Sequence, residues 1–171
     1  MILQPSQALA DIVERMAPND EQRAILARSS DDTLVSAGAG TGKTRTLVAR
    51  YLSLLAAGHS LRSIVAVTFT RKAAHEMRNR VREAIRLYLE SPGLSEVDGQ
   101  RWKGYYSELD AARIGTIHSL CAEILRAHPA ETGLDPRFEV LEEAAAGLLL
   151  GEAREATLAW AATREDLGPL F

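Results

Sequence analysis

The segment Ala37-Gly38-Ala39-Gly40-Thr41-Gly42-Lys43-Thr44 decides the fold of this chain. A β-prone run over residues 33–36 precedes the segment, and a helical pattern over 46–52 follows it. This strand–loop–helix order is the context that a P-loop requires. Glycines let the loop turn its backbone N–H groups toward phosphates, and the dipole of the following helix adds positive potential. The segment therefore predicts a phosphate-binding loop within an α/β fold.

The side chains of the loop suit the same chemistry. Lys43 can reach the β- and γ-phosphates of a nucleotide as a point charge, and Thr44 offers a hydroxyl to Mg²⁺. The strict pattern begins with glycine, where this chain has Ala37. The alternative is a Gly/Ala-rich turn between a strand and a helix. Gly-Lys-Thr at the required spacing favours the phosphate loop.

Composition limits the class of protein. The chain has 171 residues, of which 46% are hydrophobic, and a formal net charge of −3. It is long enough for one domain with a core, and a nucleic-acid site would have to be a local patch. The single cysteine, Cys121, lies in an apolar helical stretch and is expected to be a buried thiol in a reducing compartment. No signal peptide and no membrane-spanning run are visible, so the expected location is the cytoplasm.

The expected secondary structure alternates between helices and strands. Residues 91–110, which contain Pro92 and Gly93, are expected to form a loop or a partly structured insertion, and 130–137 a turn region. The alternation predicts an α/β fold with a mostly parallel sheet. Helices are expected over 6–16, 20–26, from the phosphate loop to 57, and over 72–90, 117–127 and 142–164, and strands over 33–36, 64–69 and 113–116.

Four segments together resemble the superfamily 1 helicases typified by UvrD, Rep and PcrA. Residues 18–22 resemble the glutamine motif of that family, and 37–44 its first nucleotide motif. Residues 68–78 resemble the single-strand-binding motif Ia, and 115–119 the next DNA-contacting motif. A P-loop alone would indicate only a broad superfamily, whereas the four motifs in this order are specific. The resemblance implies a RecA-like motor domain that binds ATP, Mg²⁺ and single-stranded DNA.

The resemblance assigns selection of ATP to Gln22. The amide of this side chain has a donor and an acceptor, which match N6 and N7 of adenine. The alternative is a solvent-facing glutamine near a helix start. The family often has leucine where this chain has Pro18, which affects loop packing and leaves the amide chemistry intact. The residues expected to contact the nucleotide are Gln22, Ala37, Gly38, Ala39, Gly40, Thr41, Gly42, Lys43, Thr44 and Arg45.

The resemblance also predicts a DNA site. Phe69 follows a predicted parallel strand at its carboxyl end, where α/β sheets bind ligands, and an aromatic ring there can stack on a base. The alternative is a core residue at a strand end. Arg71 stands where many relatives have asparagine but suits a phosphate. His118 is expected to contact DNA or to orient the strand–helix junction on which it lies. The residues expected to contact DNA are Thr68, Phe69, Thr70, Arg71, Thr116, His118 and Ser119.

The helix after Phe69 is locally basic. Residues 71–86 hold six Arg or Lys residues and two Glu residues. A face of this kind usually indicates only a solvated helix, and after a DNA motif it could also hold the DNA backbone. The sequence leaves both interpretations open.

Residues 125–143 indicate a branch of the superfamily 1 helicases. They resemble the start of the helical 1B insertion of these helicases. Their sequence is most similar to the corresponding segment of helicase–nucleases of the AddAB/RecBCD kind. This resemblance implies DNA repair or recombination, DNA junctions as partners, 3′ to 5′ translocation and a nuclease or recombination partner subunit. The expected division is an N-terminal helix over 1–17, a partial RecA-like domain 1A over 18–120, and the start of subdomain 1B over 121–171.

The acidic motif of the family, Asp-Glu-x-x-Asp after a strand, does not occur in this sequence. Without these carboxylates Mg²⁺ loses a ligand and the attacking water loses its base. We therefore expect an N-terminal part of a helicase that by itself binds ATP and DNA weakly, without unwinding and with negligible ATPase activity. The alternative is a non-catalytic, truncated paralogue. A small-molecule kinase is disfavoured, because it has no need of the segments at 68–70 and 115–119.

Overall fold

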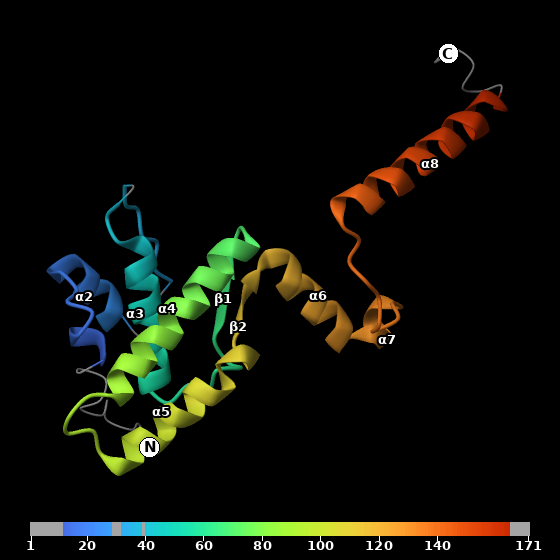
Figure 1. The fold of residues 1–171 in the computed structure, drawn as a ribbon. Helices are drawn as coiled ribbons and strands as arrows, with labels where there is room; N and C mark the ends of the chain where they lie inside the picture. The colour runs from blue at the N-terminus through green and yellow to red at the C-terminus, as the bar shows by residue number, and fades with distance from the viewer. Residues whose placement is uncertain (1–11, 29–31, 39, 165–171) are drawn as a thin grey trace. The chain divides into compact units, whose positions relative to one another are not determined.

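The computed structural model describes residues 12–28, 32–38 and 40–164 (Figure 1). The chain divides into two compact units, residues 1–121 and 122–171. The elements in chain order are α2 (Asp20–Ala27), α3 (Lys43–Ala56), β1 (Val65–Thr68), α4 (Arg71–Leu89), α5 (Glu96–Glu108), the 3-10 helix η1 (Leu109–Ala111), β2 (Arg113–Thr116), α6 (Ile117–Ala127), α7 (Pro129–Thr132) and α8 (Glu143–Ala162).

Strands β1 and β2 form a parallel pair in the first unit. Val65 pairs with Arg113 at one end of the pair, and Thr68 pairs with Thr116 at the other. Since the strands are parallel, both carboxyl ends lie at the same edge of the sheet. Helix α4 begins at this edge after Thr70, and α6 begins there directly after Thr116. The edge therefore brings together the two segments that were predicted to contact DNA.

Helix α4 organises the core of this unit. It packs against both strands and against α3 and α5 (Figure 1). Its residues Met77, Val81 and Ile85 follow one another at intervals of four and are almost fully buried. Leu52 and Leu55 of α3 are buried in the same core. Each such side chain stabilises the fold by about 1.5–3 kcal/mol relative to an exposed one.

The region over 91–110 is largely helical and not the predicted loop, so that expectation is wrong. Ser95 caps α5, because its side chain accepts a hydrogen bond from the backbone N–H of Asp98 at 3.1 Å. Trp102 is fully buried, with its ring 5.3 Å from that of Tyr88 and 5.4 Å from that of Tyr105. Burial of this aromatic cluster outweighs the helix-weakening effect of the glycines.

Two further expectations are wrong. Residues 33–36 are not in a strand, and Leu34 in that run is 97% exposed. A strand needs a hydrogen-bonded neighbour, and the sheet in the described part of the chain consists of β1 and β2. Cys121 is exposed and not the predicted buried thiol, whereas the adjacent Ala122 is buried. An apolar stretch does not tell which of its residues faces the core.

The limits of the other predicted helices and strands, from α2 to α8, agree with those in the structure to within two residues. The predicted helix over 6–16 lies mostly outside the described residues. In the part of this range that the structure describes, residues 12–14 are helical.

The second unit contains the end of α6, α7 and α8. Helix α7 occupies the start of the predicted turn region over 130–137, and Gly133 ends it with φ +67°. The guanidinium of Arg126 donates to the Phe138 carbonyl at 3.1 Å and lies 4.8 Å from the centre of the Phe138 ring. Among the described helices, none has the length and apolar character needed to cross a membrane.

Candidate nucleotide and DNA sites

The phosphate loop closes around the ammonium group of Lys43. The Nζ atom donates to the carbonyl of Ala37 at 2.7 Å and to that of Gly38 at 2.5 Å. Gly40 and Gly42 have φ values of +79° and +87°, which only glycine adopts without strain. The sequence prediction of a glycine-dependent turn at these positions is borne out by the backbone, whereas Ala39 lies outside the described residues.

Helix α3 begins directly at the end of this loop. Gly42 is its N-cap residue, and the first turn contains no acidic side chain. The side chains of Lys43 and Thr44 are exposed in that turn. Backbone N–H groups of a first turn have no partner within their own helix, and the helix dipole adds positive potential there. The start of α3 is therefore suited to an anion.

Gln22 lies beside the phosphate loop although 19 residues separate it from Thr41. Its backbone N–H donates to Oδ1 of Asn19 at 2.8 Å, and its Oε1 accepts from the backbone N–H of Asn19 at 3.1 Å. This reciprocal capping box starts α2. The Nε2 atom faces the carbonyl of Thr41 at 3.5 Å. The capping box thus turns the amide nitrogen toward the loop, an orientation inferred from its hydrogen bonds.

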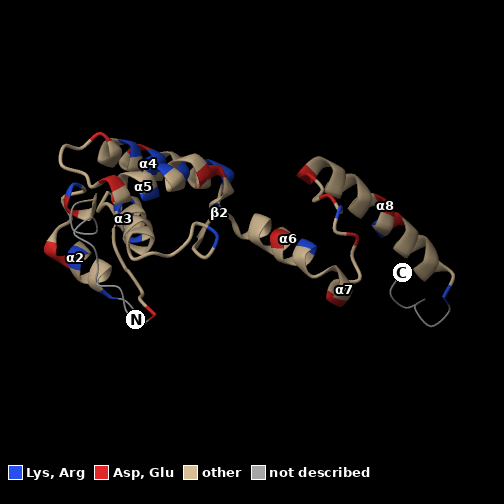
Figure 2. Ribbon diagram, turned by 90° about the horizontal axis from the view of Figure 1, so that it is seen from below, with Lys and Arg blue, Asp and Glu red and all other residues tan. Residues whose placement is uncertain are grey.

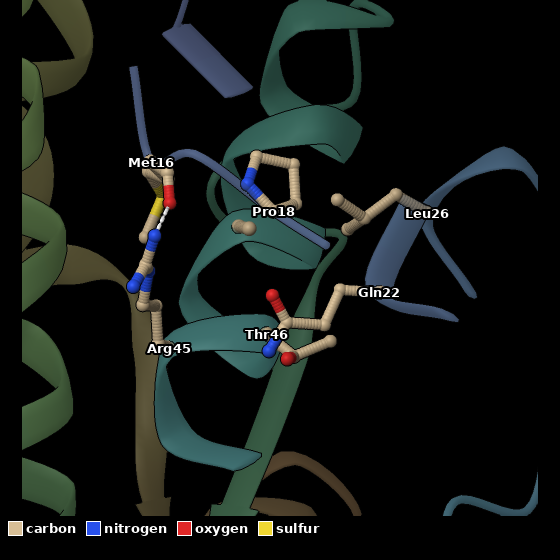
Figure 3. A pocket seen from close by; sticks show the side chains of 7 residues that line it. Met16, Pro18, Gln22, Leu26, Arg45 and Thr46 are labelled. Carbon is tan, nitrogen blue, oxygen red and sulfur yellow. Dashed lines mark hydrogen bonds between the residues drawn. The ribbon is translucent and has the colours of Figure 1, made fainter. Parts of the chain in front are cut away.

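Arg45 ties α3 to the segment before α2. Its guanidinium donates to the carbonyl of Met16 (Figure 3). It also donates to the carbonyl of Ala17 at 2.8 Å. Ala17 has φ +40°, an uncommon value for a residue other than glycine. The pocket beside this contact is lined by Met16, Pro18, Gln22, Leu26, Arg45, Thr46 and Ala49. Gln22 and the start of α3 thus border one pocket.

Phe69 is not a core residue. It follows β1 directly and its side chain is 99% exposed. Thr70, the next residue, caps α4 by accepting a hydrogen bond from the N–H of Ala73 at 3.1 Å. The side chain of Arg71, in the first turn of α4, is exposed as well. An aromatic ring and a cation therefore face solvent together at the carboxyl edge of the sheet.

At the neighbouring strand end, Thr116 and Ser119 bond to each other. The Thr116 N–H donates to Oγ of Ser119 at 2.8 Å, and the Ser119 N–H donates to Oγ1 of Thr116 at 3.2 Å. His118, between them, is exposed. The structure therefore brings all seven residues predicted to contact DNA to one edge of the sheet.

The basic residues of α4 divide into two groups. Arg78 donates to the carbonyl of Ile114 at 2.7 Å, and Arg82 pairs with Asp110 at 2.6 Å. Arg86 pairs with Glu83 and Glu90, each at 2.6 Å. These hydrogen bonds raise the pKa of Arg86 above its ordinary value, and the bond to Arg86 lowers the pKa of Glu83.

The second group of cations on α4 is exposed to solvent. It consists of Arg71, Lys72 and Arg80. Figure 2 shows basic residues distributed along α4 with acidic ones among them. Because three of the six cations bind partners within the protein, only Arg71, Lys72 and Arg80 among the described residues of α4 are free for the partial role in holding the DNA backbone that the sequence left open.

Tyr51 of α3 is an unusual member of the core. Its ring is 2% exposed, and its hydroxyl has no hydrogen-bond partner in the described part of the chain. Burial raises the pKa of Tyr51 to about 12, although the nearby positive charge of Arg78 opposes this rise. The neutral phenol is therefore the form that the fold accommodates.

The geometry of the loop and the sheet edge agrees with a comparison of the chain with known families. Residues 18–166 match the UvrD/REP helicase N-terminal domain. This chain belongs to the UvrD/REP helicase family. The resemblance predicted from the four motifs is thereby confirmed.

Similar proteins place this UvrD/REP helicase domain within one branch. The chain is 37% identical over 131 residues to an ATP-dependent helicase/nuclease subunit of Ligilactobacillus salivarius, a match that covers 77% of the chain and 10% of that protein. It is 41% identical over 138 residues to the protein of that name from Desulforudis audaxviator, covering 78% and 11%. With that of Limosilactobacillus fermentum, identity is 34% over 164 residues, covering 90% and 12%.

These relatives agree with the predicted resemblance to the helicase–nuclease branch. The chain spans about a tenth of the length of each of them. The motifs at 18–22, 37–44, 68–78 and 115–119 all lie within the part that matches the UvrD/REP helicase N-terminal domain.

Proposed function

We propose that this chain is the ATP- and single-stranded-DNA-binding N-terminal part of an ATP-dependent DNA helicase. The observation that carries the proposal is the phosphate loop, in which Gly40 and Gly42 have positive φ values and the ammonium group of Lys43 donates to the carbonyls of Ala37 and Gly38. Family membership supports the helicase assignment. In this proposal residues 18–120 are part of a RecA-like motor domain, and residues 121–171 begin its 1B insertion.

The residues around the loop fit ATP with Mg²⁺. Lys43 would bind the β- and γ-phosphates, and the backbone N–H groups of 38–44 would surround them. Thr44 would supply one hard oxygen ligand to Mg²⁺, whose role is to neutralise phosphate charge. Gln22 would read adenine through its amide, which already lies beside the loop. Arg45 would border the base from the start of α3.

The exposed edge of the sheet would hold the DNA. Phe69 would stack on a base, and Arg71 and His118 would contact the backbone. Because the relatives are named as a subunit of an ATP-dependent helicase/nuclease, we further propose that the whole protein works with a partner subunit. From the family resemblance we propose that it acts in DNA repair or recombination and translocates 3′ to 5′.

The chain by itself should bind ATP without hydrolysing it. None of its carboxylates follows a strand as Asp-Glu-x-x-Asp, so the attacking water would have no base. The same observation supports a second candidate, a non-catalytic nucleotide- and DNA-binding paralogue. Whether the reading frame continues to such an acidic strand distinguishes the two. A DNA-stimulated ATPase rate that Lys43→Ala abolishes would contradict the expected inactivity.

Binding of nucleotide tests the proposal through base selection. A fluorescent ATP analogue should be displaced from the chain by ATP more effectively than by GTP. Gln22→Ala should reduce this preference, whereas Glu21→Ala, an exposed neighbour on α2, should keep it. Equal displacement by ATP and GTP from the unmodified chain would refute the role of Gln22, and no binding of the analogue would refute the proposed function.

A further inference from the structure

Two sets of hydrogen bonds link the ends of β1 and β2 to each other and to the helices that follow them. The hydroxyl of Thr68 lies 3.0 Å from the Thr70 carbonyl and 3.3 Å from the Gly115 carbonyl. The hydroxyls of Thr116 and Ser119 lie 3.0 Å apart. Two segments far apart in the sequence are thus joined by side-chain hydroxyls at the proposed DNA edge.

The hydroxyl of Ser119 has no capacity left for a ligand. A serine hydroxyl can donate one hydrogen bond and accept two. In this structure it donates to the Thr116 carbonyl at 2.8 Å and accepts from the Thr116 N–H at 2.8 Å. Its third position faces Oγ1 of Thr116 at 3.0 Å. A phosphate oxygen, which only accepts, could bind Ser119 only after one of these bonds broke.

Thr116 and Thr68 are committed in the same way. The hydrogen-bond network assigns the Ser119 proton to the Thr116 carbonyl, and with this assignment the proton between the two hydroxyls is that of Thr116. Thr116 also accepts from the Ser119 N–H at 3.2 Å. The single proton of Thr68 is shared between the carbonyls of Thr70 and Gly115. None of these three hydroxyls therefore has a proton to donate to DNA.

Gly115 is matched to this arrangement. A Cβ atom at this position would lie 2.7 Å from Oγ of Ser119 and 3.7 Å from its Cβ. The first distance is a clash, whereas the second is an ordinary contact. A side chain at position 115 would therefore displace the Ser119 hydroxyl from its hydrogen bonds, whereas the backbone conformation at 115 does not itself require glycine.

The other predicted DNA residues remain available. Thr70 accepts from the Ala73 N–H and keeps its own proton for an acceptor. Phe69, Arg71 and His118 are exposed, and no hydrogen bond within the described part of the chain involves their side chains. The seven residues thus divide into three hydrogen-bonded hydroxyl residues (Thr68, Thr116 and Ser119) and four contact residues (Phe69, Thr70, Arg71 and His118).

We propose that the three hydrogen-bonded hydroxyl residues are positioning residues, which fix the starts of α4 and α6 and thereby present the four contact residues to DNA. This inference rests on the proposed DNA-binding function. It differs from a direct role for every residue of the two motifs, because it assigns Thr68, Thr116 and Ser119 no contact with the ligand.

Thermal unfolding tests the arrangement independently of DNA. Ser119→Ala removes the Ser119 half of the reciprocal cap at the start of α6 and should lower the melting temperature by roughly 4 °C. Gly115→Ala, which displaces the Ser119 hydroxyl, should lower it by about as much in the native background, and by less than half as much in the Ser119→Ala background, because the clashing oxygen is gone. If Gly115→Ala lowers the melting temperature equally in both backgrounds, the inference that Gly115 is matched to the Ser119 hydroxyl is wrong.

Binding to a fluorescent single-stranded oligonucleotide tests the positioning role. Thr116→Val removes the hydroxyl and should weaken binding, whereas Thr116→Ser keeps the hydroxyl and should bind within about twofold of the unmodified chain. His118→Ala should weaken binding about fivefold in the native background and less than about twofold in the Ser119→Ala background.

The outcomes separate the two proposals. If His118→Ala and Ser119→Ala reduce affinity by factors that simply multiply, Ser119 contacts DNA itself and the positioning role is wrong. If the unmodified chain binds no oligonucleotide, the proposed function and the positioning of DNA contacts both fail. The unfolding measurements still decide whether the hydrogen-bonded hydroxyl residues hold the starts of α4 and α6.

Discussion

Replacement of Phe69 by alanine should weaken DNA binding without destabilising the fold. The side chain is 99% exposed, so its removal exposes no core surface and leaves no cavity. Loss of one stacked base costs about 1–3 kcal/mol, which corresponds to a decrease in affinity of about 5- to 150-fold. The ring carries no charge, so the dependence of affinity on salt should stay the same.

Fluorescence anisotropy with a labelled single-stranded oligonucleotide would measure this effect at several salt concentrations. Phe69→Trp should retain most of the affinity, because it keeps an aromatic face. Val97→Ala is the matched control, since Val97 is an exposed apolar side chain on α5. Unchanged affinity of Phe69→Ala would refute the stacking role. A lower melting temperature would instead refute the inference that Phe69 lies outside the core.

Three further predictions concern stability. Gly104→Ala should raise the melting temperature by about 2–4 °C, because the new Cβ meets no atom within 4 Å and alanine favours a helix by about 0.5–1 kcal/mol; a decrease would contradict the observed α5. Trp102→Ala should lower the free energy of unfolding in urea by about 3–5 kcal/mol, and a loss below about 1 kcal/mol would show that α5 is dispensable. Tyr51→Phe should change stability at pH 7 by less than about 1 kcal/mol, because the hydroxyl has no partner in the described chain. In the unmodified protein, the free energy of unfolding should fall between pH 10 and 12, since the unfolded state ionises Tyr51 first. Tyr51→Phe should remove part of this fall, and identical alkaline profiles would contradict the raised pKa.

The sequence predicted those elements whose local pattern and burial agree. Helix α4 has its apolar residues at intervals of four and is capped by Thr70, so its limits were predicted to within one residue. The β-branched run at β1 and the phosphate loop were equally clear, since each depends on residue types in a short stretch. The proximity of Gln22 to the loop followed only from the resemblance.

Features that depend on tertiary contacts were missed. The helical state of α5 follows from burial of Trp102 between two tyrosines, and only Ser95 with Asp98 three residues later signalled its start. The run at 33–36 has the composition of a strand, but composition does not supply a neighbouring strand. Thr116 and Ser119 have the spacing of a reciprocal cap, a signal that could have separated them from the DNA contacts.

Nucleotide affinity of a Lys43 variant tests the central claim most directly. Calorimetry with ATP and Mg²⁺ should give about 10- to 150-fold weaker binding for Lys43→Ala, which corresponds to one charge-assisted hydrogen bond of about 1.5–3 kcal/mol. Lys103→Ala, an exposed lysine on α5, should bind ATP as tightly as the unmodified chain. If Lys43→Ala and Lys103→Ala bind ATP equally well while both remain folded, the loop over 37–44 does not hold the nucleotide phosphates and the proposed function is contradicted.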